Sequence, residues 1–299
     1  MSLGPITAKR AIKRAAGWAA VLTSPWVSRP DRPRACILMY HRVAALDFVD
    51  PRLDDWNVPP PVFAEHVAAL AEFAECVPLA QLPARLRATG PGERPLVCIT
   101  FDDGYANFVD AALPVLSRHR VPAACFVVTS CVASEEPMPF DRWAQRHGRG
   151  VGAEAWRAAD WSALERALAS GLVTIGSHSH RHRDGSRCDA QALADEAGRS
   201  REILLRRLGP AAAAAYAYPY GSSRLGHVSD AYVGAVRAAG YAMAVSTDLG
   251  LADAASDILR LPRIEANPLD SAAVLRAKVR GALLPYRVTD RLRMPRYAA

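Results

Sequence analysis

Residues 95–104 read PLVCITFDDG, an apolar and β-branched run that leads directly into two adjacent carboxylates and a glycine. A run of this kind, bounded by turn residues, is typical of a buried strand. Asp102 and Asp103 at its end repel each other, and their removal from water is costly unless a cation or donor compensates. The sequence therefore predicts positive charge close to this strand end.

Similar runs alternate with helical patterns from residue 35 onward. The predicted strands are 35–41, 95–101, 122–128, 172–178, 214–221, 241–247 and 258–264. The predicted helices are 61–75, 105–119, 160–170, 189–208 and 229–239. Residues 131–160 are expected to form an irregular insertion. This alternation predicts parallel strands covered by helices, and about seven strands in one block predict an α/β fold, a distorted or incomplete (β/α) barrel.

The residues that could carry chemistry share one position, at or just past the C-terminal end of a predicted strand. They are His41, Asp102, Asp103, His178, Tyr220 and Asp248. Barrel enzymes place their active sites on that face. We therefore expect these side chains to meet at one mouth of the barrel.

The stretch IGSHSHRHRDG, residues 175–185, contains three of the eight histidines. On a helical turn, His178 and His182 would share one face and could bind one cation, while His180 would point elsewhere. Two imidazoles and one carboxylate leave coordination positions open, as in a catalytic zinc site. One aspartate of the pair would then bind the cation and the other would act as a base. For each motif alone, a solvated histidine cluster and a capping aspartate are the alternatives.

Three motifs carry a resemblance to a known family. TFDDG (100–104), HSHRH (178–182) and YPYG (218–221) resemble, in this order, motifs of the NodB-homology polysaccharide deacetylases, carbohydrate esterase family four. ILMYHRV (37–43) and RLPRI (260–264) resemble the ends of the domain in bacterial exopolysaccharide members, so the resemblance covers about residues 35–266. It implies a barrel of fewer than eight strands and metal-dependent hydrolysis of N-acetyl groups on amino sugars.

The resemblance also implies roles for individual residues. Asp103, His178 and His182 would be the metal ligands, and Asp102 would be the general base. The backbone N–H of Tyr220, in the YPYG turn, would stabilise the oxyanion. Zn²⁺ is the expected metal, with Co²⁺, Ni²⁺ or Mn²⁺ as alternatives.

The sequence departs from the family pattern in two places. The late Leu-x-His motif is missing, because RLPRIEANP contains no histidine, and we expect His41 to serve as the general acid instead. The usual arginine two residues before Pro-Tyr is Ala217 here, and we expect Arg263 to orient Asp102 in its place. Asp248 is expected to contact substrate or to orient His41, with a capping role as the alternative.

Charge divides the 299 residues unevenly. The net charge is +7, yet residues 1–14 hold four basic and no acidic residues, and residues 271–299 hold seven basic residues and one aspartate. We expect a basic extension (1–34), a deacetylase barrel (35–268) and a basic helical tail (269–299). The two ends predict either solvated helices or peripheral contact with an anionic membrane. No nucleic-acid recognition module is present, and the sequence does not predict the oligomeric state.

Cysteine use and hydropathy bear on location. The cysteines show no CxxC pair and are Cys36, Cys76, Cys98, Cys125, Cys131 and Cys188. They predict buried, reduced thiols and hence the cytoplasm, with peripheral contact at the inner membrane face as an extension of that prediction. No run approaches the roughly 18 apolar residues of a spanning helix, and AAGWAAVL (15–22) is a poor match to a signal peptide.

The predicted function is metal-dependent hydrolysis of linear amide C–N bonds, not peptide bonds, in N-acetylated sugars. The substrate would be a polysaccharide, an oligosaccharide or a lipid-linked glycan. A deformylase or other small-amide hydrolase, and an inactive carbohydrate-binding barrel, are the alternatives. The charged residues argue against the inactive barrel, because a buried charge cluster is costly to keep without a use.

Overall fold

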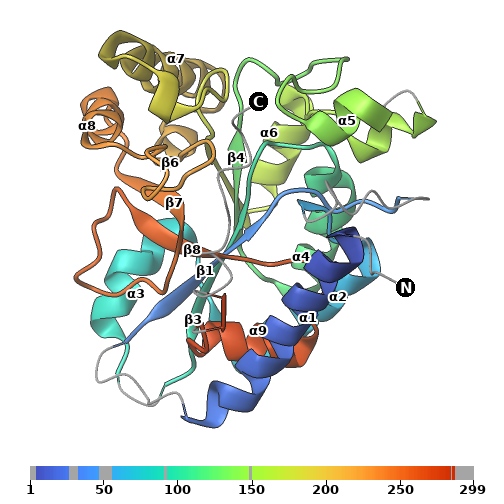
Figure 1. Ribbon diagram of the computed structural model, residues 1–299. Helices are drawn as coiled ribbons and strands as arrows, with labels where there is room; N and C mark the ends of the chain where they lie inside the picture. The colour runs from blue at the N-terminus through green and yellow to red at the C-terminus, as the bar shows by residue number, and fades with distance from the viewer. Residues whose placement is uncertain are drawn as a thin grey trace.

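The computed structural model describes residues 5–26, 33–46, 56–90, 93–147, 150–283 and 285–286 (Figure 1). Within these residues, seven parallel strands form a closed ring, in which β1 pairs with both β3 and β8. The strands are β1 (Ala35–Tyr40), β3 (Leu96–Phe101), β4 (Ala123–Val127), β5 (Val173–Ser177), β6 (Ala215–Ala217), β7 (Met243–Leu249) and β8 (Leu261–Glu265). The predicted barrel is therefore confirmed. The short strand β2 (Glu75–Cys76) extends the sheet beside β3, outside the ring.

Helices cover the outside of the ring, as the strand–helix alternation predicts. They are α2 (Pro60–Phe73), α3 (Leu82–Ala88), α4 (Leu113–His119), α6 (Trp161–Ala169), α7 (Ala190–Leu208), α8 (Asp230–Ala239) and α9 (Ala272–Val279). The short helix α5 (Arg142–His147) lies in the insertion instead. The carboxylate of Asp160 caps α6 by accepting the amide of Ala163 at 2.7 Å. The predicted helix 105–119 instead begins as a π-helical turn, η4 (Phe108–Ala112), because Pro114 in the first turn of α4 has no N–H for a regular helix.

Residue parity in the strands decides which side chains face the barrel axis. Leu96 and Cys98 of β3 belong to an apolar cluster shared with β1, β4, β7 and β8, whereas the odd-numbered residues of β3 pack under the helices. Because side chains alternate along a strand, Thr100 and Asp102 follow on the inner side. The same parity places Arg263 of β8 inward, two residues after Leu261. The apolar barrel interior therefore ends in polar groups at its C-terminal mouth.

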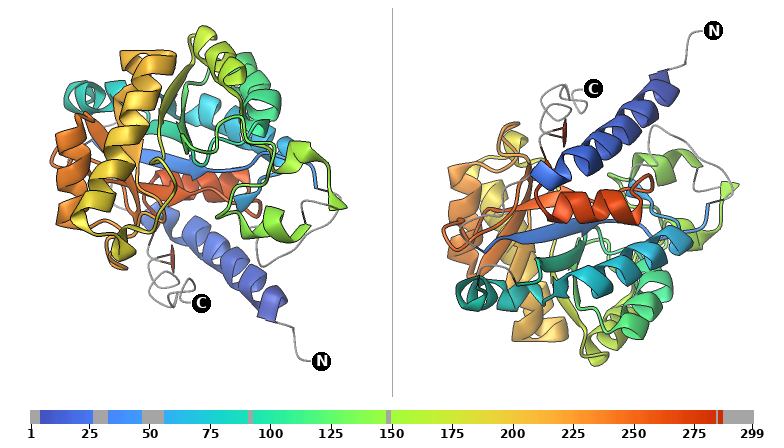
Figure 2. Two further views of the ribbon diagram at one scale, coloured as in Figure 1. Left: turned by 90° about the horizontal axis from the view of Figure 1, so that it is seen from above. Right: turned by 90° about the horizontal axis from the view of Figure 1, so that it is seen from below.

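Two helices near the ends of the described chain, α1 (Pro5–Thr23) and α9, form a layer against the barrel (Figure 2). α1 packs on α9, and a Cβ on Gly17 would lie 3.2 Å from Val274 Cγ2, so glycine permits this close approach. Leu275 and Val279 of α9 belong to the main core. The predicted tail thus begins with a helix that packs on the barrel; residues 287–299 of the tail and 27–32 of the extension lie outside the described residues.

Two further expectations from the sequence can be compared with the structure. All six cysteines lie in the described part of the chain as free thiols, four of them buried. Residues 131–160 are mainly irregular, with α5 and a short 3₁₀ turn, η6 (Ala153–Ala155). Among the described residues, we find no helix that is both long and apolar enough to cross a bilayer.

Candidate metal centre and active site

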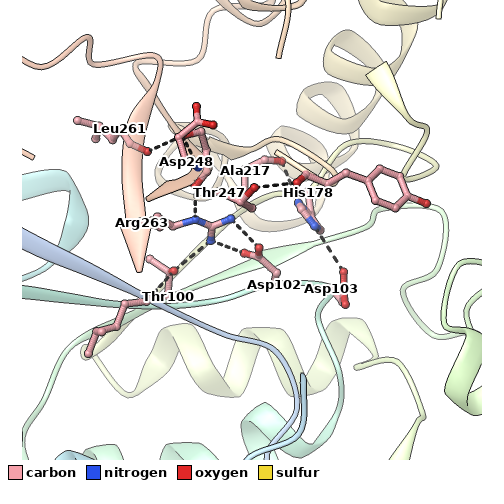
Figure 3. Close-up of polar contacts among 12 residues, drawn as sticks. Thr100, Asp102, Asp103, His178, Ala217, Thr247, Asp248, Leu261 and Arg263 are labelled. Atoms are coloured by element: carbon pink, nitrogen blue, oxygen red, sulfur yellow. Dashed lines mark hydrogen bonds and ion pairs between the residues drawn. The ribbon is translucent and has the colours of Figure 1, made fainter. Parts of the chain in front are cut away.

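Asp102 and Arg263 form a buried ion pair at the mouth of the barrel (Figure 3). Nη1 and Nη2 of Arg263 donate to Oδ1 and Oδ2 of Asp102, each at 2.7 Å, which is a two-bonded fork. Nε donates to the carbonyl of Ser246 at 2.8 Å, and Nη1 also donates to Thr100 Oγ1 at 3.2 Å. The guanidinium is thereby fixed by β7, by β3 and by Asp102 directly after β3, and it in turn fixes the carboxylate.

This ion pair decides the charge of Asp102. Burial acts to raise the pKa of Asp102, but the adjacent guanidinium of Arg263 opposes it and the pKa lies well below the usual value. Asp102 is therefore an ionised acceptor at neutral pH. The sequence expectation placed Arg263 at this carboxylate in place of the missing arginine, and the structure places it there.

Asp103, His178 and His182 converge beside this pair. Oδ1 of Asp103 lies 3.4 Å from Nε2 of His178 and 3.6 Å from Nε2 of His182. One ligand atom from each of the three residues lies within 4.8 Å of the others. His178 is held by its other nitrogen, because Nδ1 donates to the carbonyl of Ala217 at 2.8 Å. That bond leaves Nε2 with its lone pair directed at the carboxylate.

The backbone that brings the two imidazoles together is not helical, so the predicted helical turn is wrong. Residues 178–182 form an irregular bend in which Ser179 and His182 have φ angles of 68° and 56°. Ser179 Oγ accepts the amide of His182 at 2.8 Å and stabilises the bend. The two imidazoles, four residues apart, are therefore brought together by a bend with left-handed residues and not by a helix. His180 does point elsewhere, with Nδ1 3.0 Å from Thr129 Oγ1.

The donors at this site fit a divalent cation. Burial lowers the pKa of both His178 and His182, which keeps the imidazoles in the neutral form that binds metals. Burial, followed by the charges of Asp102 and Asp141, raises the pKa of Asp103 well above its usual value. A cation bound by Asp103 would offset the repulsion between its carboxylate and those of Asp102 and Asp141. This is the positive charge that the two adjacent aspartates at the strand end predict. Two imidazole nitrogens and one carboxylate form the donor set of a catalytic zinc site.

The insertion at residues 131–160 contributes a side chain that the sequence did not indicate. The ring of Phe140 stacks on His182 with centroids 3.8 Å apart and planes 15° apart. On another side, the ring of Tyr220 meets His182 edge-on, with centroids 4.9 Å apart. Two aromatic rings thus restrict the orientation of this imidazole. Phe140 lies in a stretch with no periodic pattern, so no local signal could have found it.

A second buried ion pair anchors the insertion to the barrel. Arg42 Nη2 donates to Asp141 Oδ2 at 2.6 Å, and Tyr105 Oη donates to the same oxygen at 2.7 Å. The Arg42 guanidinium also lies over the rings of Tyr105 and Trp143, at 4.7 and 4.6 Å from the centroids. Because Arg42 follows His41 directly, this network joins the insertion to the residue after β1. The sequence did not indicate this pair.

The YPYG turn places Tyr220 beside the candidate metal ligands. Tyr220 and Gly221 have φ angles of 59° and 62°, and the carbonyl of Tyr220 accepts Thr247 Oγ1 at 2.8 Å. A Cβ on Gly221 would lie only 2.7 Å from Thr247 Cγ2, so this position requires glycine. The turn is therefore fixed against β7. An oxyanion role for the Tyr220 amide stays a prediction.

Asp248 is the second-last residue of β7, so it lies at the C-terminal end of this strand, as expected. Its Oδ1 accepts the amide of Ser223 at 2.9 Å, and its Oδ2 accepts the Ser223 hydroxyl. These bonds stabilise the turn after YPYG, so they favour the structural alternative. A contact between Asp248 and substrate stays a prediction.

His41 leaves the sheet next to Asp102. Tyr40 of β1 pairs with Phe101 of β3, so the residues that follow these two are neighbours. His41 is a half-buried residue, and its ring packs on Trp56 with centroids 4.5 Å apart. Burial lowers the pKa of His41 to about 4, although the charge of Asp102 acts in the opposite direction. His41 is thus neutral at neutral pH, and its role as an acid stays a prediction.

We expect Arg263→Ala to lower turnover by about 100-fold, because misplacing a catalytic group costs this much. Arg263→Lys keeps the charge but loses the fork, so we expect an intermediate loss. With a weaker partner, the pKa of Asp102 rises, and the acidic limb of the pH–rate profile should move to higher pH. Thermal unfolding checks for collapse, because breaking a buried pair costs roughly 3–5 kcal/mol. Full activity and an unchanged profile in Arg263→Ala would refute an orienting role.

A closed barrel with an Asp/His/His cluster beside an ionised carboxylate defines a class of hydrolase. Residues 89–244 match the sequence model of the polysaccharide deacetylase family, which is more than half of the chain. The chain belongs to this family, whose members are hydrolases that act on N-acetyl amide bonds. The predicted family and enzyme class are confirmed. His41 and Arg263 both lie outside the matched residues.

Individual relatives agree with this assignment. The Bacillus subtilis (strain 168) protein YxkH, which is named as a polysaccharide deacetylase, is 21% identical over 248 residues, covering 82% of this chain and 76% of YxkH. The structure of Streptococcus pyogenes deacetylase PplD in complex with acetate superposes with a TM-score of 0.67 at 20% identity, covering 83% of this chain and 99% of PplD. IcaB from Ammonifex degensii gives a TM-score of 0.64 at 21% identity, covering 85% of this chain and 99% of IcaB. At these identities, the two solved structures show the fold.

Proposed function

We propose that this chain removes acetyl groups from N-acetylated amino sugars of a glycan in a reaction that depends on a divalent metal, with Zn²⁺ as the first choice. The observation that carries the proposal is the convergence of Asp103, His178 and His182 beside an Asp102 held ionised by Arg263. PplD, whose fold this chain shares, was solved with acetate, the product that such a reaction releases. That ligand supports the acetyl group as the part removed.

Hydrolysis of an acetamide needs a polarised carbonyl, an activated water and a proton for the departing nitrogen. A divalent ion bound by Asp103, His178 and His182 would supply Lewis acidity for the carbonyl and acidify water. Asp102 lies next to these ligands with its lone pairs fixed by Arg263, so it accepts the proton of the attacking water. The backbone N–H of Tyr220, on a rigid turn beside His182, stabilises the oxyanion.

The proton balance assigns a part to His41. Hydrolysis transfers one proton from the attacking water to the departing nitrogen. Each catalytic group ends the cycle in the protonation state in which it began. With a pKa of about 4, His41 is a neutral imidazole at neutral pH, so it has to gain a proton before it can protonate the nitrogen. The proton that Asp102 removes from water is therefore the one that reaches the nitrogen, and His41, as its neighbour across β1 and β3, passes it on. This refines the expectation that His41 serves as the general acid.

Acetate release tests this function. Protein stripped by a chelator is reloaded with Zn²⁺, or in parallel with Co²⁺, Ni²⁺ or Mn²⁺, and incubated with N-acetylglucosamine oligomers of increasing length. We expect acetate and free amine to appear in equal amounts, and only with metal present. Release of formate from N-formylated sugars, without acetate from N-acetylated ones, would favour the deformylase alternative. Turnover of neither substrate class by metal-loaded protein would refute the proposal.

The cellular location also stays a proposal. The six free cysteines support a reducing compartment, and we place the protein in the cytoplasm on that ground. Cell fractionation with thiol-specific labelling checks this, since oxidised cysteines in the native protein would contradict it.

A further inference from the structure

The helix α1 has two apolar faces, and only one of them is covered. Ala16, Gly17 and Ala20 are buried against α9, where Ala20 packs with Ala277. A helix with one covered face should be polar on the other. In Figures 1 and 2, α1 lies on the outside of α9, so its other face points away from the barrel.

That outward face carries large apolar side chains. Ile12, Trp18, Leu22 and Trp26 are 54%, 67%, 66% and 78% exposed, and among the described residues they are the complete set of exposed large hydrophobic side chains. Trp18 and Leu22 are four residues apart, and Trp26 follows after another four in the 3₁₀ turn η1 (Ser24–Trp26), so they form one stripe. Single exposed hydrophobic residues are normal, but a set gathered on one element marks an interaction surface.

The charge of this element indicates which kind of partner fits. Residues 5–26 contain four basic residues and no acidic one. Lys13 is paired with Glu265, while Arg14 is exposed beside the stripe and Arg280, just past α9, is also exposed. Tryptophan and leucine flanked by arginine match the interface of a bilayer with anionic lipids, where the rings sit at the headgroup level. α1 is not among helices that are both long and apolar enough to cross a bilayer.

We propose that α1 and η1 are an interfacial anchor that inserts Trp18, Leu22 and Trp26 into the boundary of an anionic membrane, with Arg14 at the lipid phosphates. The anchor is rigidly joined to the barrel through α9 and through the bond from Lys13 to Glu265 at the end of β8. This surface is separate from the residues proposed for hydrolysis.

Vesicle co-sedimentation with the full chain tests the proposal. We expect wild-type protein to pellet with vesicles of phosphatidylcholine and phosphatidylglycerol, and to remain in the supernatant with phosphatidylcholine alone. Trp18→Ser combined with Leu22→Ser should weaken binding at least about tenfold through lost apolar burial. Arg14→Glu should weaken it as well, and added salt should have the same effect. Ile203→Ser, at a half-buried position of α7, is the control for loss of an apolar side chain away from α1 and should bind like wild type.

Unchanged melting temperature and unchanged acetate release from soluble oligomers would show that these variants are folded. Wild-type protein that stays in the supernatant with anionic vesicles at low salt would overturn the proposal. Equal binding of wild type and the double variant would overturn it as well. Light scattering gives the oligomeric state of each protein. A dimeric wild type and a monomeric double variant would also overturn the proposal, because a second copy of the chain would then cover the stripe.

Discussion

Asp102→Asn is expected to lower acetate release by about 10²–10⁴-fold, the usual contribution of a positioned general base. The substitution keeps the shape of the side chain and an oxygen that Arg263 can bind, but an amide cannot accept the proton of the attacking water. Arg263 keeps its bonds to Ser246 and Thr100, so the guanidinium should stay in place. Zinc binding should be unaffected, because Asp102 is not among the three converging ligands.

Asp160→Asn is the matched control for this prediction. It makes the same chemical change at the cap of α6, where asparagine caps as well as aspartate. Its rate should equal that of wild type. Equal rates in Asp102→Asn and wild type would point to a contaminating enzyme or to a different base, and would remove Asp102 from the proposed mechanism.

The second large effect is expected when the metal ligands are changed. His182→Gln should reduce acetate release by at least about 100-fold, because it removes one of two imidazoles from a site whose ion stabilises the transition state by several kcal/mol. Chelation of the wild-type protein should have the same effect and should be reversed by added Zn²⁺. The rate with and without metal, on the same oligomers, checks both outcomes.

His180→Gln is the control for the metal ligands, since it makes the same change two residues away. The His180 ring faces Thr129 and not Asp103, so we expect activity close to wild type. An equal loss of activity in His180→Gln and His182→Gln would show that the bend, and not a ligand, was disturbed. Chelated protein that keeps its full rate would contradict a role for metal.

The barrel and the strand ends were predictable because they depend on local rules. The run before Asp102 has strand composition, and the period of two places Thr100 and Asp102 on the inner side once the apolar positions are known. Strand ends of a parallel barrel meet at one mouth, so residues far apart in the sequence could be placed together. This is why the sequence could predict a contact between Arg263 and Asp102.

The guanidinium that orients Asp102 comes from a different strand than in the family pattern, and the sequence could predict this. Where the family pattern has an arginine, Ala217 has a small side chain in the barrel interior and gives only its carbonyl, to His178. The guanidinium comes from β8 instead, where Arg263 is 1% exposed. The missing charge at one strand end indicated that another strand end had to supply it.

The features that were missed depend on contacts that no local pattern encodes. The bend at 178–182 needs left-handed residues that are not glycine, and a spacing of four alone suggested a helix. The stacking of Phe140 on His182 and the Arg42–Asp141 pair arise from how an irregular insertion folds back on the mouth. Sequence spacing gives no register for such a segment, so its side chains could not be assigned to the site.

Zinc titration of chelator-stripped protein tests most directly whether Asp103, His178 and His182 hold one ion. Competition with a chromophoric chelator gives both the stoichiometry and the affinity, and it needs no substrate. We expect one zinc ion per chain in wild type, Asp102→Asn and His180→Gln, and no tight binding in His182→Gln or Asp103→Asn. A wild-type protein that binds no zinc, or a His182→Gln protein that binds it as tightly as wild type, would contradict the proposed centre.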